Sequence, residues 1–152
     1  MSWYELLLTL HVLAMGLWFG SGLAILVMAT RARSNATAFG TFAVNAGWWA
    51  GRAHPTAGVI LLLTGFAMVA DADLDLGETW IWLAIVGLVV AFAIGGALIG
   101  RTSNALTREI ESAGGVLTEQ SRPLADQLLL YARLELAVLV LVVADMVAKP
   151  GG

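Results

Sequence analysis

The feature that most constrains the fold of this chain is an uncharged apolar run close to its N-terminus. Residues 6–29 include no Asp, Glu, Lys or Arg. About 20 apolar residues are enough for a helix to cross the hydrocarbon core of a bilayer. The run is longer than that, so we expect a membrane-spanning helix here. His11 is the one side chain in it that can titrate near neutral pH or bind a metal through nitrogen.

The composition extends this expectation to the whole chain. Of its 152 residues, 59% are hydrophobic and 12% are charged, and the mean hydropathy is +0.84. A soluble domain carries about 25% charged residues. The net charge of −3 gives no reason to expect a nucleic-acid partner. The chain has no cysteine, which excludes disulfides, thiolate zinc sites and cysteine-ligated iron–sulfur clusters.

Four apolar stretches predict four membrane spans, at residues 3–30, 35–70, 79–100 and 127–148. The second is long and contains Pro55, so we expect a bend near residues 52–55. The N-terminus lacks the basic region of a signal peptide, and its apolar run is too long for one. The predicted fold class is an all-α transmembrane four-helix bundle, with residues 1–152 as a single membrane domain.

The arginines predict the orientation of the bundle, because cytoplasmic connections are enriched in Lys and Arg. Lys149 is the one basic residue beyond the end of a span on the side of the termini. The connections between the first and second spans and between the third and fourth spans hold five arginines: Arg31, Arg33, Arg101, Arg108 and Arg122. Both termini should therefore lie on the non-cytoplasmic side.

The spacing of the two histidines, His11 and His54, suggests a common site. Residues of an antiparallel hairpin lie level when the mean of their numbers equals the midpoint of the turn. The mean of 11 and 54 is 32.5, the centre of a basic turn at residues 31–34. Since both helices rise 1.5 Å per residue, we expect the two imidazoles at one depth.

Small residues accompany both histidines. Met15, Trp18 and Gly22 share the helical face of the first histidine, and Gly51 and Gly58 share that of the second. Such faces leave space for a flat macrocycle with an axial nitrogen on each side, so we predict haem b between the two helices. The predicted metal ligands are both histidines, and the predicted cofactor-binding residues are His11, His54, Arg52, Met15, Trp18, Gly22, Gly51 and Gly58.

Other interpretations of these residues stay open. A histidine in lipid can simply hydrogen-bond another helix. Arg52 needs an anion, which is either Glu135 or a haem propionate. Met15 is either an axial thioether or an ordinary core residue. Zinc or copper is less well supported, because no third nitrogen, thiolate or well-placed carboxylate completes a ligand set.

A family resemblance adds to this interpretation. The sequence LHVLA at residues 10–14, followed by LWFGSG at residues 17–22, resembles the His-x6-Trp-x-Gly-type first helix of small bacterial membrane proteins. These include copper-resistance D-type proteins, HemJ-type protoporphyrinogen oxidases and an uncharacterised family of predicted four-helix integral membrane proteins, which RAHP at residues 52–55 fits best. The HemJ resemblance implies b-type haem on His11. The chain departs from that pattern in having no lysine in its first two spans.

The sequence therefore predicts a b-type haem protein of the bacterial cytoplasmic membrane that works in electron transfer or haem sensing. The alternatives are a non-catalytic membrane subunit with packing histidines and a porphyrinogen oxidase-like enzyme. The expected partners are the lipid bilayer, haem, and either other membrane redox subunits or further copies of the chain.

Overall fold

The computed structural model describes residues 1–150, and the regular structure in this part of the chain is helical throughout. Four helical stretches are long and apolar enough to cross a membrane, which confirms the predicted all-α four-helix architecture. The third stretch is a single rod, Thr79–Ser112, made of three consecutive elements. The elements are α1 (Trp3–Ala32), α2 (Ala36–Asp71), α3 (Thr79–Phe92), the π-helix η1 (Ala93–Ile99), α4 (Gly100–Ser112) and α5 (Arg122–Ala148).

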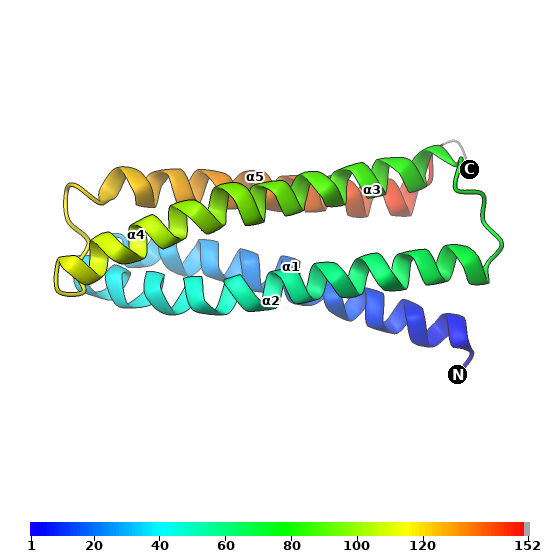
Figure 1. Ribbon diagram of the computed structural model, residues 1–152, viewed down its shortest axis with the longest axis horizontal. Helices are drawn as coiled ribbons and strands as arrows, with labels where there is room; N and C mark the ends of the chain where they lie inside the picture. Colours follow the sequence, from blue (N-terminus) through cyan, green and yellow to red (C-terminus); the bar gives the residue numbers. More distant parts are fainter. Residues whose placement is uncertain (151–152) are drawn as a thin grey trace.

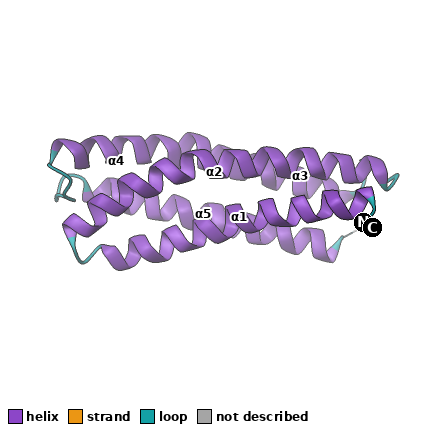
Figure 2. Cartoon of the chain, turned by 90° about the horizontal axis from the view of Figure 1, so that it is seen from below, coloured by secondary structure: helices purple, strands orange, loops and turns teal. Residues whose placement is uncertain are grey.

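The helices form two antiparallel pairs that run side by side (Figures 1 and 2). One pair is α1 with α2, and the other is the α3–η1–α4 rod with α5. Helix α4 also packs against α2. We call the end that holds both termini and the α2–α3 connection the terminal end. The opposite end, with the α1–α2 and α4–α5 connections, is the arginine end.

Local sequence explains where the helices begin and end. Ser2 and Glu5 form a capping box: the Ser2 hydroxyl accepts from the Glu5 N–H at 3.1 Å, and the Glu5 carboxylate accepts from the Ser2 N–H at 2.7 Å. The Asn35 side chain caps α2 by accepting from the Ala38 N–H at 3.0 Å. At the end of α4 the chain turns through Gly114 and Gly115, whose φ angles of +71° and +88° favour glycine.

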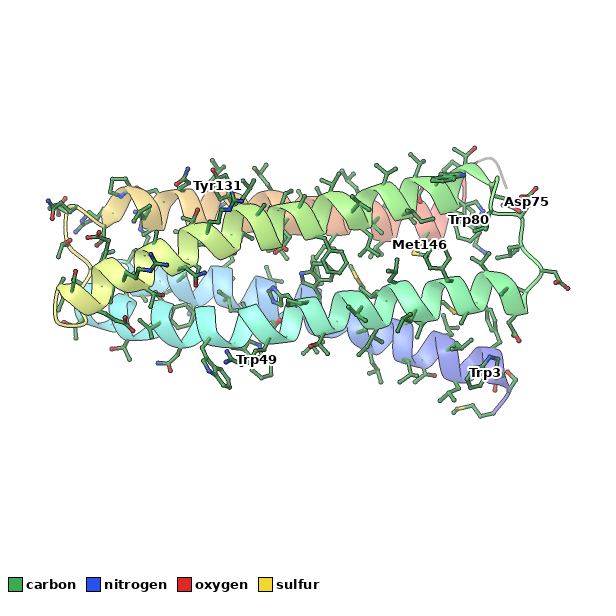
Figure 3. The ribbon with its side chains drawn as sticks, in the orientation of Figure 1. Trp3, Trp49, Asp75, Trp80, Tyr131 and Met146 are labelled. Carbon is green, nitrogen blue, oxygen red and sulfur yellow. The ribbon has the colours of Figure 1, made fainter. Side chains whose placement is uncertain are left out.

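The bundle is longer than a bilayer is thick. Helix α2 has 36 residues, about 54 Å at 1.5 Å per residue, whereas the hydrocarbon core is about 30 Å. Figure 3 places Trp3 and Trp80 at the terminal end, and Trp49 and Tyr131 part of the way along the bundle. Trp and Tyr gather at membrane–water interfaces. We infer that the bilayer covers the part of the bundle between these two aromatic levels.

The arginine end then extends into water, and its packing agrees with this. It has an apolar core that includes Phe39, Leu106, Ile110 and Leu117, each at most 4% exposed. Helix α4 is polar over the rest of its surface, as a soluble amphipathic helix is. A salt bridge between Arg33 and Asp126 ties the end of α1 to the start of α5.

The third span contains irregular backbone that the sequence did not predict: η1 replaces α-helical turns over Ala93–Ile99. This segment contains the pair Gly95 and Gly96, whose low helix propensity makes such a departure inexpensive. Helix α2, in which a bend near residues 52–55 was predicted, continues through Pro55 without a break in its helical assignment.

Labelling of single cysteines tests the orientation. The chain has no cysteine, so Ser2→Cys and Ser112→Cys each introduce a unique thiol, one at each end of the bundle. In intact cells, an impermeant maleimide should label the Ser2→Cys protein and should leave the Ser112→Cys protein unlabelled until the membrane is opened. The reverse pattern would contradict the orientation that the arginines predict.

Candidate functional site

The two imidazoles lie at different depths, each bonded to a hydroxyl of the other helix. His11 Nδ1 is 2.8 Å from Thr64 Oγ1, and His54 Nε2 is 3.0 Å from Ser21 Oγ. The His11 ring thus lies level with Thr64, ten residues along α2 from His54. Ten residues correspond to roughly 15 Å along a helix. The prediction that the rings share one depth is wrong.

The direction of helical side chains explains this separation. The Cα–Cβ bond tilts toward the N-terminus of its own helix. In an antiparallel pair, the rings of His11 and His54 therefore lean in opposite directions, the first toward the terminal end and the second toward the arginine end. The turn also lies later than expected, after Ala32. Residue numbers alone give the backbone positions of the two histidines and do not include this tilt.

These residues do not fit a haem held between two histidines. Axial ligation needs both imidazole nitrogens on one iron, and the rings face separate contacts. The small residues provide no common slot either. A Cβ built on Gly58 would lie 2.2 Å from Phe92 Cζ and 2.8 Å from Trp18 Cζ3, so protein side chains fill that space. Gly51 has nothing within 4 Å of such a Cβ and is exposed.

The glycines of α1 lie either against protein side chains or on the exposed surface. A Cβ at Gly22 would touch Leu136 at 3.3 Å and the ring of His54 at 3.9 Å. Gly22 therefore leaves no space for a macrocycle beside His54. Gly16 and Gly20 are exposed, and a Cβ built on either of them would meet nothing within 4 Å.

Arg52 is not paired inside the bundle. It is exposed, its guanidinium donates to the Trp48 carbonyl at 3.0 Å, and it lies 4.4 Å over the Trp48 ring. No salt bridge joins it to Glu135 in residues 1–150. The pairing with Glu135, one of the two that the sequence left open, is therefore wrong. Since α2 is longer than the bilayer is thick, we infer that Arg52 lies near the interface, where it needs no buried anion.

We infer from the hydrogen bonds which nitrogen of each ring carries the proton. The Thr64 hydroxyl donates to the Ile60 carbonyl at 2.6 Å, so it accepts from His11 Nδ1–H. The Ser21 hydroxyl likewise donates to the Leu17 carbonyl at 2.5 Å and accepts from His54 Nε2–H. His11 therefore keeps a free lone pair on Nε2. A histidine that binds a metal through one ring nitrogen usually donates the N–H of its other nitrogen to a protein acceptor, which orients the ring.

A cavity of about 720 Å³ adjoins His11 in the terminal half of the bundle. Its walls come from α1, α2, α3 and α5 and are mostly apolar. Met15 lies on the His11 side of the cavity, and Met146 approaches from α5. Tyr4 and Lys149 supply polar groups at the terminal end. His54, Trp18, Gly22, Gly51 and Gly58 are not among the residues that line this cavity.

A second cluster lies deeper, around Trp18. This side chain is 1% exposed, and its ring stacks on His54 at a centroid distance of 6.2 Å and tilts against Phe92 at 5.3 Å. Glu135 of α5 lies next to the indole N–H, although the two are not in hydrogen-bonding geometry. It is 3% exposed. Glu135 was predicted as a possible partner for Arg52, and its position beside the Trp18 indole was not predicted.

The comparisons with known proteins define the family. Residues 5–150 match the model of a family described as "Predicted integral membrane protein (DUF2269)". The match covers nearly the whole chain, so the chain is a member of this family and an integral membrane protein. Neither the curated proteins nor the solved structures contain a match. The resemblance to HemJ-type and copper-resistance proteins stays a prediction.

Two glycine substitutions test the packing around Trp18. Gly58→Ala should destabilise the bundle by about 1–3 kcal/mol, because the new methyl group overlaps Phe92 and Trp18. Gly51→Ala is the matched control: its methyl group meets nothing, and alanine is the better helix former by about 0.5–1 kcal/mol. Thermal unfolding in detergent measures both. Equal melting temperatures for the two variants would contradict the packing described here.

Proposed function

We propose that this chain is a membrane protein that binds b-type haem in the terminal-half cavity, with His11 as its protein ligand. The observation that carries the proposal is the free Nε2 lone pair of a histidine whose other nitrogen is held by Thr64, at the wall of a large apolar cavity. This modifies the sequence-based expectation: the ligand set has one histidine, and His54 is not part of it.

The cavity has suitable properties for such a cofactor. Its volume of about 720 Å³ lies within the range of roughly 300–1,000 Å³ that is usual for cofactor sites. Apolar walls from four helices suit the porphyrin face. Lys149 lies at the end toward water and would hold a propionate, since a cation there offsets the carboxylate charge. Its Nζ lies 5.2 Å from the Trp80 ring centroid.

The sixth coordination position decides between the two functions that we consider. Met15 projects from the same helix as His11, one turn away, whereas two axial ligands must approach from opposite sides. Met146 comes from α5 and is the thioether better placed to complete the iron coordination. With Met146 bound, the site suits electron transfer; with that position open, it suits sensing of haem or of a small ligand.

A structural role for the histidines is the second candidate. Both imidazoles bond a hydroxyl across the α1–α2 interface, as helix-packing polar residues in membranes do. Such bonds are worth about 0.6–2 kcal/mol each. Under this alternative the chain is a non-catalytic membrane subunit, and the cavity is occupied by lipid.

Histidine substitutions with a haem readout separate these candidates. The purified protein, incubated with haemin in detergent, should show a Soret band that Met146→Leu shifts if the thioether is bound. His11→Ala should abolish the band, because the protein ligand is gone. His54→Ala should retain it, because that ring lies roughly 15 Å away along the helices.

Melting temperatures of both alanine variants serve as the control for folding. Each loses one interhelical hydrogen bond, so each should be destabilised to a similar degree. Absence of haem binding by the folded wild-type protein would favour the packing role. Loss of the band in His54→Ala alone would contradict the single-histidine site.

A further inference from the structure

Glu135 is a buried acid in the membrane-covered part of α5. Its side chain is 3% exposed, and its Oε1 atom has no hydrogen-bond partner in residues 1–150. It lies 13 residues before the end of α5 at Ala148, about 20 Å along the helix. Tyr131, at the opposite aromatic level, lies four residues before Glu135, about 6 Å along the helix, so the carboxyl group lies within the membrane-covered part and nearer its arginine side.

The protein backbone makes room for this carboxyl group. A Cβ on Gly95 would lie 2.6 Å from Glu135 Oε1, so the carboxyl group occupies the place of a side chain on η1. Gly95 belongs to the single π-helical segment of the described chain. Short π-helical segments are frequent at functional sites. Gly95 and the π-helical segment of the third span therefore both lie next to the Glu135 side chain.

No cation offsets a negative charge at this position. Helix α1 presents the Trp18 indole, and its N–H is itself buried and unpaired. His54 of α2 lies across the Trp18 ring from this cluster and is bonded to Ser21. Arg52 is exposed and bound to Trp48.

The other packed elements also lack a counter-ion. Arg101, at the start of α4, is exposed, and η1 has no charged residue. His11, the other titratable group of α1, bonds Thr64 in the terminal half. On α5 itself, Arg133 and Asp145 form no salt bridge in residues 1–150.

An unpaired carboxylate in this setting would be costly. Transfer of an ionised group out of water without a partner is so unfavourable that the group binds a proton or a cation instead. A metal ion would need several oxygen ligands. The described residues contain no cluster of three or more His, Cys, Asp or Glu side chains here.

We propose that Glu135 is an intramembrane proton-binding site, formed by its carboxyl group in the space left by Gly95 on the π-helical turn of the third span. The ligand is a proton taken from water by the carboxylate, which yields the neutral acid. The Trp18 indole lies between this site and the His54 ring. The proposal does not depend on haem.

Infrared spectroscopy of the full chain in lipid bilayers tests the proposal. At neutral pH we expect the C=O stretch of a protonated carboxylic acid, shifted in D₂O and moved to lower frequency by 13C-labelled glutamate. Glu135→Gln should remove the band. Glu111→Gln, which alters an exposed acid of α4, is the control and should leave it unchanged.

The 13C label assigns the band to glutamate in the wild-type protein, so the test does not depend on the folding of a variant. Asp145 has two buried carboxylate oxygens without partners and could give a similar band, but 13C-labelled glutamate does not shift an aspartate signal. Gly95→Ala should change the frequency of the glutamate band, because the new methyl group displaces Oε1. Absence of a glutamate acid band in the wild-type protein at neutral pH would overturn the proposal. So would a band that sodium ions remove, since that result identifies a cation site.

Discussion

The structure depends on the cost of leaving a polar group in hydrocarbon without a hydrogen-bond partner. Two imidazole–hydroxyl hydrogen bonds avoid this cost for the histidines, His11 with Thr64 and His54 with Ser21. The residue numbers of both pairs have the same mean, 37.5, so one register of the α1–α2 hairpin makes both bonds. A shift of this register would leave two half-buried rings without partners. The hairpin is thereby the fixed frame against which α3, α4 and α5 pack.

This register divides the membrane-covered part of the bundle into two regions with different chemistry. Near the terminal end, the helices surround an apolar cavity with His11 at its wall. Deeper in the bilayer, Trp18 fills the interior and separates His54 from Glu135. The first region has the space for a large flat ligand. The second has no comparable space, and its two unpaired polar atoms suit an ion as small as a proton.

Hydropathy alone was sufficient to predict the four helices, because about 20 uncharged apolar residues have few alternatives to a membrane span. The predicted positions of individual side chains were wrong where they rested on residue numbers without side-chain geometry. His11 and His54 were expected to be level, but side-chain tilt moves their rings apart. Arg52 was placed in lipid because each apolar stretch was taken as wholly embedded, whereas α2 extends into water. The surroundings of Glu135 could not be predicted, since they depend on a π-helical turn in another helix.

The protonation pattern of the two rings tests the central claim most directly, since it follows from the two hydrogen bonds that define the register. Solid-state NMR of 15N-histidine-labelled protein in bilayers distinguishes the two neutral tautomers, and Thr64→Val and Ser21→Ala assign the signals. The account predicts one histidine protonated at Nδ1, sensitive to Thr64→Val, and one protonated at Nε2, sensitive to Ser21→Ala. Two histidines with the same tautomer, or a Thr64→Val change that alters the His54 signal alone, would contradict it.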